Sequence, residues 1–169
     1  VLSEETPSVA PATVERRNTT VGIRTAFGTF FPLTHPDVQV VLPALGTYGS
    51  LLFAKAFERC GIRAQALPPA DPQRLKLGRG HCSCKECLPL QTCMGTFLDY
   101  VNRRPAEEIT AFFMASADGP CRFGQYHVFF QRIIRNLGIP NAAVISLSST
   151  NGYGGLGTRF TAAGWRSIV

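Results

Sequence analysis

The six cysteines are the residues of this chain best suited to chemistry, because four of them fall within one twelve-residue stretch. They are Cys60, Cys82, Cys84, Cys87, Cys93 and Cys121. A disulfide framework is typical of small secreted chains that lack a core, and we find no basic stretch followed by an apolar run that would direct export. Clustered thiols in an intracellular protein indicate metal ligands or redox groups. We therefore expect a cytoplasmic protein with thiol chemistry.

The spacing of these thiols leaves the kind of site open. The segment 81–87 (HCSCKEC) holds one C-x₂-C pair, Cys84 and Cys87, but not the two such pairs of common zinc modules, and it does not match the ferredoxin run. An iron–sulfur cluster, a zinc ion and no metal at all are each compatible with it. His81 could add a nitrogen ligand, although a plain loop residue is the more usual role. Cys60 and Cys93 lie on apolar faces of predicted helices, where free cysteine behaves as a small buried hydrophobe.

Short apolar runs alternate with helical patterns and predict the elements that must position the cysteines. The expected strands cover 38–42, 63–67, 109–115 and 142–147, and the expected helices cover about 53–60, 71–77, 88–101 and 122–137. Short connections between them imply parallel strands with right-handed crossovers. We therefore expect an α/β fold with an open three-layer parallel sheet of about four to five strands, flavodoxin-like or Rossmann-like.

The rest of the chain predicts less structure. Residues 1–20 carry prolines and several Ser and Thr without periodicity, and are expected to be a linker or tail before a single α/β domain at 21–169. Glycines 78 and 80 are expected to open the cysteine-bearing loop. A glycine-rich loop at 151–157 precedes a final helical piece. Because the chain starts at Val1, we expect a fragment of a longer protein.

On such a fold, two cysteines from separate segments should meet. Cys87 follows the second strand and Cys121 follows the third, each at the start of a helix. Carboxyl ends of parallel strands share one edge, where sites form, and a helix N-terminus stabilises a thiolate. We therefore predict that Cys87 and Cys121 converge, with Cys82 and Cys84 on a loop nearby.

Composition excludes several other classes. With 45% apolar and 17% charged residues, the chain is too apolar for a disordered protein. No apolar run approaches the ~18 residues of a membrane span. The net charge of +6 is spread along the chain, without the basic stripe of a nucleic-acid binder. We expect neither a membrane nor a nucleic acid as partner.

Two segments resemble a known family. They are 85–90 (KECLPL, with Gly95 following) and 119–126 (GPCRFGQY), supported by a weaker match at 146–149 (SLSS). Together they resemble the cysteine-containing domain of the CoA-substrate-specific enzyme activases, which are similar to 2-hydroxyacyl-CoA dehydratase and benzoyl-CoA reductase components and to double-cubane cluster proteins. The resemblance covers about residues 38–157.

The resemblance implies an iron–sulfur cluster, [4Fe–4S] or larger, and low-potential electron transfer in acyl-CoA metabolism. Cys87 and Cys121 match the family's cluster-ligand candidates, whereas Cys82 and Cys84 lie outside its pattern and leave the ligand number open. The matched segment also places five residues beside the cluster: Arg122, Gln125 and Tyr126 around the ligands, and Gly119 and Gly124 as cofactor-binding backbone.

Long members of the family also carry an actin-like ATPase portion. Its phosphate loops are missing here, so ATP hydrolysis is expected elsewhere in a longer chain, with a homodimer and a redox partner protein as further expectations. Whether the chain itself is an enzyme stays open. Two other hypotheses remain: a non-catalytic α/β interaction domain with structural zinc or no metal, and a thiol–disulfide regulatory domain.

Overall fold

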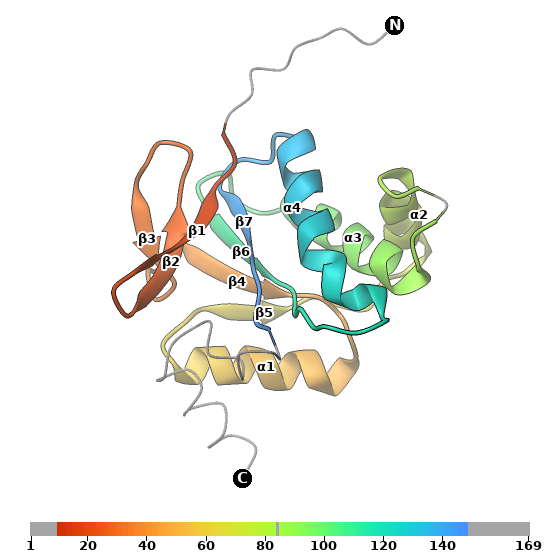
Figure 1. Ribbon diagram of the computed structural model, residues 1–169, viewed down its shortest axis with the longest axis horizontal. Helices are drawn as coiled ribbons and strands as arrows, with labels where there is room; N and C mark the ends of the chain where they lie inside the picture. The colour runs from red at the N-terminus through yellow and green to blue at the C-terminus, as the bar shows by residue number, and fades with distance from the viewer. Residues whose placement is uncertain (1–9, 84, 149–169) are drawn as a thin grey trace, which may run out of the picture.

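The computed structural model describes residues 10–83 and 85–148, which form two sheets and the helices around them (Figure 1). The antiparallel sheet has the order β1-β2-β3, and the parallel sheet has the order β5-β4-β6-β7. The strands are β1 (Thr13–Arg17), β2 (Thr20–Arg24), β3 (Phe30–Pro32), β4 (Val38–Leu42), β5 (Ala64–Ala66), β6 (Ile109–Phe113) and β7 (Ala142–Ile145). The helices are α1 (Thr47–Arg59), α2 (Pro72–Gly80), α3 (Leu88–Val101) and α4 (Tyr126–Asn136), with a 3₁₀ turn η1 (Arg122–Gln125).

The parallel sheet confirms the predicted open α/β fold. The chain passes from β4 through α1 to the edge strand β5, then returns across β4 through α2 and α3 to β6, and continues through α4 to β7. In order along the chain these strands lie 2-1-3-4, which is the flavodoxin-like rather than the Rossmann order. The direction of winding reverses between β4 and β6, so the topological switch point lies beside β6, the strand that precedes Cys121.

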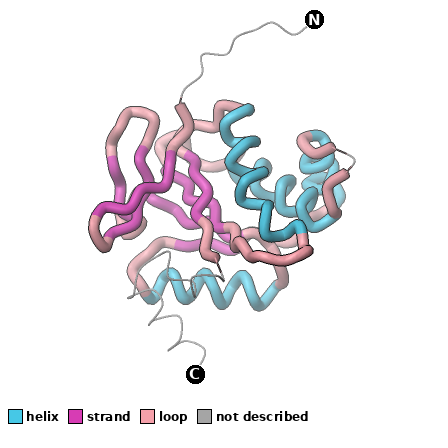
Figure 2. Tube along the Cα trace, viewed as in Figure 1, coloured by secondary structure: helices cyan, strands magenta, loops and turns pink. Residues whose placement is uncertain are grey.

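Successive side chains of the buried strands face opposite sides of the parallel sheet, so helices can pack on both of its faces. Val40 of β4 packs in the core beneath α1, whereas its neighbour Val41 packs in the core beneath α3 and α4. Figure 2 shows the same division, with α1 on one side of the strands and the other three helices on the other. None of the described helices combines the length and apolar character that crossing a membrane requires.

The helix beginnings follow local sequence signals. The Asp71 side chain accepts a hydrogen bond from the backbone N–H of Arg74 at 2.8 Å, and Pro72 takes the first helical position, as predicted. In α3 the predicted apolar face is buried, including Met94 and Phe97. Because α3 leads back to the start of β6, its N-terminus lies at the carboxyl edge of the parallel sheet.

The prediction of a linker over 1–20 is wrong for its described part. Thr13–Arg17 forms β1, which pairs with β2 through a turn at Asn18, whose φ is +54°. Four of the five β1 residues are exposed, so no apolar alternation marks the strand. Its pairing depends instead on β2 and β3, whose Ile23 and nearby Leu33 join the core on the α1 side.

The prediction of a loop opening at Gly78 is also wrong, because α2 continues to Gly80. A side chain at Gly78 would overlap the carbonyl oxygen of Gln91, and one at Gly95 would overlap that of Arg74. The two glycines therefore let α2 and α3 approach closely. This packing offsets the low helix propensity of glycine.

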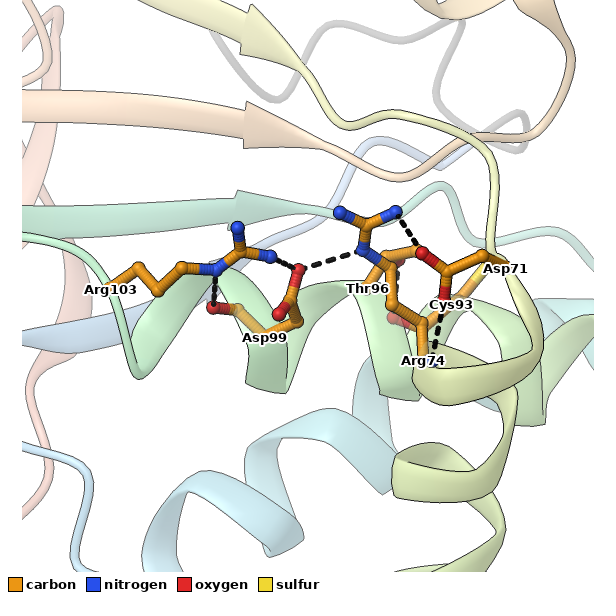
Figure 3. A network of polar contacts seen from close by, with 6 residues as sticks. All are labelled: Asp71, Arg74, Cys93, Thr96, Asp99 and Arg103. Atoms are coloured by element: carbon orange, nitrogen blue, oxygen red, sulfur yellow. Dashed lines mark hydrogen bonds and ion pairs between the residues drawn. The ribbon is translucent and has the colours of Figure 1, made fainter.

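Polar contacts join α2 to α3 and support the α3 residues at this contact (Figure 3). The guanidinium of Arg74 donates to Asp71 at 2.8 Å and to Asp99 of α3 at 2.7 Å. Arg103 also donates to the Asp99 carboxylate, and the Thr96 hydroxyl donates to the carbonyl of Cys93. Since α2 leads directly to Cys82, these contacts position the cysteine-bearing loop against the start of α3.

Candidate thiol site at the carboxyl edge of the sheet

Cys87 is the N-cap residue of α3 and lies half-buried at the carboxyl edge of the sheet. Its Sγ is 2.5 Å from Oη of Tyr126, the first residue of α4, so the two groups share a hydrogen bond. Tyr126 is only 4% exposed. Burial raises the pKa of this phenol, followed by the hydrogen bond with Cys87. The Tyr126 hydroxyl therefore keeps its proton and can donate to the sulfur.

Cys121 lies exposed in the loop after β6, close to the same group. The charges of Cys87 and Cys121 both contribute to raising the pKa of Tyr126, after burial and the hydrogen bond. The guanidinium of Arg122 donates to the carbonyl oxygen of Lys85 at 2.9 Å, which joins the two cysteine segments directly. The structure thus brings the segments of Cys87 and Cys121 to one edge, with neither thiol sealed in the core.

The predicted helix start at Cys121 needs a correction. Cys121 precedes the four-residue turn η1, and α4 begins only at Tyr126. Helix dipoles act within about the first turn, so Cys87 lies at the positive end of α3, whereas Cys121 lacks an α-helix directly after it.

The two glycines of the GPCRFGQY segment have distinct backbone roles. Gly119 has a φ of +139°, a conformation that side-chain-bearing residues rarely adopt. A side chain at Gly124 would overlap the carbonyl oxygen of Ala117. Both glycines therefore shape the loop that presents Cys121.

Cys82 is half-buried near Cys87. Burial raises the pKa of the Cys82 thiol to about 11, with smaller contributions from the charges of Glu86 and Cys87. Cys84 lies outside the described residues. Within 10–83 and 85–148, no three His, Cys, Asp or Glu side chains are grouped so that they could hold a metal ion. The described part of the site therefore holds the thiols of Cys82, Cys87 and Cys121, with the Tyr126 phenol in contact with Cys87.

The remaining cysteines are core residues. Cys93 is 2% exposed on the buried face of α3, and burial raises its thiol pKa to about 12. Cys60 packs partly buried on the α1 side of the sheet, on the face opposite Cys87. His81 ends α2 as its C-cap residue. The small-hydrophobe interpretation is confirmed for Cys93, and Cys60 lies too far from the site to join it.

A cavity of about 420 Å³ opens beside Cys87 and Tyr126. Its lining comprises Lys85, Glu86, Cys87, Leu90, Arg122, Gln125, Tyr126, Val128, Phe129 and Arg132. The contributions of Val128, Phe129 and Arg132 were not anticipated from the sequence. The recurrence of Arg122, Gln125, Phe129 and Arg132 at helical spacing is the signal that could have revealed this shared face.

Comparisons of the chain with protein-family models, with curated proteins and with solved structures find no match.

Proposed function

We propose that this chain is an iron–sulfur cluster-binding electron-transfer module of an activase- or dehydratase-type low-potential reductase system in acyl-CoA metabolism. The observation that carries the proposal is the joining of the Cys87 and Cys121 segments at the carboxyl edge, through Arg122 and Tyr126. These are the same two segments on which the family resemblance depends. In this proposal the protein is cytoplasmic, and ATP hydrolysis and the redox partner lie outside this chain.

The donor chemistry at this edge fits such a cluster. Thiolates are the protein ligands that iron–sulfur clusters require, and Cys87 and Cys121 would supply two of them. The Tyr126 hydroxyl would donate to the Cys87 sulfur, and Arg122 would offset negative charge nearby. The bound cluster would supply one-electron transfer. Further ligands would come from Cys84, from Cys82 or from a second chain.

Anaerobic reconstitution with iron and sulfide tests this proposal. We expect the protein to bind iron and sulfide together and to become brown. Cys87→Ala and Cys121→Ala should each reduce bound iron and sulfide strongly. Cys60→Ala is the matched control, because Cys60 lies on the opposite face of the sheet, and it should retain the wild-type content. Iron binding that is unaffected by both test substitutions would contradict the proposal.

A second candidate function is a non-catalytic α/β interaction domain with structural zinc or no metal. Its metal-free form is favoured by the observation that no group of three ligands forms among the described residues, whereas its zinc form would need ligands beyond them. Elemental analysis of protein prepared with zinc, and thermal unfolding with and without a chelator, separate the candidates. One zinc per chain and a chelator-sensitive melting temperature would support structural zinc over the cluster.

A further inference from the structure

The cavity beside Cys87 has a positive rim. Lys85, Arg122 and Arg132 line it, against a single acidic residue, Glu86. One oxygen of the Glu86 carboxylate already accepts a hydrogen bond from Ser83 at 2.7 Å. Among the residues that the structure describes, none of the three cations forms an ion pair. The rim therefore holds three positive side chains and one negative one, and none of the positive groups is held in an ion pair with a described acidic side chain.

The cavity wall between these charges is apolar. Leu90 lines it from α3, and Val128 and Phe129 line it from α4. Val128 is 49% exposed, so part of this apolar wall faces solvent. The volume lies within the range of small-molecule sites, roughly 300–1,000 Å³. Apolar walls with a few convergent polar groups are also typical of such sites.

We propose that this cavity binds a small organic carboxylate with an apolar body. The planar guanidinium of Arg132 matches a carboxylate in shape and charge, and Lys85 and Arg122 add to the field that attracts it. The apolar body would cover Val128 and Phe129 and remove their surface from water. Binding of the carboxylate does not depend on the proposed function. If Cys87 is also a cluster ligand, as that function requires, the bound molecule would lie next to it.

The test is a titration of the full chain, labelled with ¹⁵N, reduced and free of metal, followed by amide NMR shifts. The probes are hexanoate, hexylammonium with a similar chain and opposite charge, and acetate without the chain. Hexanoate should shift the amide signals of 85–90 and 122–132 saturably. Hexylammonium, which loses the favourable charge contact, and acetate, which loses the apolar contact, should each bind at least about five-fold more weakly than hexanoate. Equal binding of hexylammonium, or shifts confined to other regions, would overturn the proposal.

Matched variants test the charged rim. Arg132→Gln should weaken hexanoate binding by about three- to five-fold, and Lys85→Gln repeats the test from a different segment. Arg135→Gln is the control: it removes the same charge from the same helix, but Arg135 lines a separate groove beside β1. If Arg132→Gln and Lys85→Gln, both folded by circular dichroism, bind like Arg135→Gln, the proposal is wrong. Since the protein is metal-free, this result is independent of the iron and sulfide analysis.

Discussion

The contact between Cys87 and Tyr126 gives the thiol site its specific chemistry. A buried phenol with a raised pKa remains a hydrogen-bond donor over the physiological pH range. The sulfur it contacts is half-buried and lies at the N-terminus of α3. Cys121, in contrast, is exposed and reaches solvent. The two thiols therefore differ in access, and ligands from outside the chain would approach from the side of Cys121.

Tyr126→Phe tests the role of this hydroxyl. If Cys87 is a cluster ligand, loss of the donated hydrogen bond should lower the midpoint potential, because hydrogen bonds to ligand sulfur stabilise the more negative reduced state. If the bond is about 1 kcal/mol stronger in the reduced state than in the oxidised state, its loss corresponds to a shift of about 40 mV for one electron. Potentiometric titration of the reconstituted protein measures it.

The control for this measurement is Tyr48→Phe, because Tyr48 is 86% exposed on α1 and lies on the other side of the sheet. Its potential should equal that of the wild type. A Tyr126→Phe protein with full iron content and an unshifted potential would show that the hydroxyl does not act on the cluster.

At the scale of elements, the pairing of α2 with α3 determines where the cysteine-bearing loop lies. The contact combines two glycines, Gly78 and Gly95, with the polar network of Arg74 and Asp99 (Figure 3). Backbone lies against backbone at both glycines, so neither helix can move aside without moving the loop that contains Cys82. The start of α3 and the end of α2 are thereby held as one unit.

Gly95→Ala should disturb this unit. The new methyl group would overlap the carbonyl oxygen of Arg74, and such overpacking costs about 1–3 kcal/mol of unfolding free energy. Gly80→Ala is the control: it also adds a methyl group to a helix glycine, but with nothing within 4 Å, so it should be neutral or slightly stabilising. Urea unfolding followed by circular dichroism compares them. Equal stability of the two variants would show that α2 and α3 do not pack this closely.

For the whole molecule, a cluster of aromatic rings joins the parallel sheet to the helices that bear the site. Phe112 of β6 is fully buried, with ring centroids 4.5 Å from Phe97 of α3 and 4.6 Å from Phe130 of α4. The first of these helices begins directly after its N-cap residue Cys87, and the second begins at Tyr126. The separation of the sulfur and the hydroxyl therefore depends on how both helices pack on one strand.

Phe112→Ala should destabilise the whole fold by about 3–5 kcal/mol, the cost of removing a buried aromatic ring and leaving a cavity. Phe27→Ala should change stability little, because Phe27 is 87% exposed. Chemical denaturation followed by far-UV circular dichroism gives the difference in unfolding free energy between each variant and the wild type. A small effect of Phe112→Ala would contradict the central packing described above.

Local patterns in the sequence were sufficient for the parallel sheet and its helices. The apolar run 38–42, the Asp71–Pro72 start and the periodic face of 88–101 each depend on near neighbours in the chain, so they predicted β4, the start of α2, and α3 correctly. The order of elements then implied that Cys87 and Cys121 lie at one edge, because carboxyl ends of parallel strands coincide.

Contacts between segments distant in the chain determined the features that local patterns did not predict. Strand β1 lacks apolar alternation and forms through pairing with β2, and α2 extends past Gly78 because α3 packs against it. The hydrogen bond of Cys87 with Tyr126 and the charged cavity at Arg132 each require two helices in one relative position. Periodicity specifies which face of a helix is buried, but only tertiary packing specifies which side chains then touch.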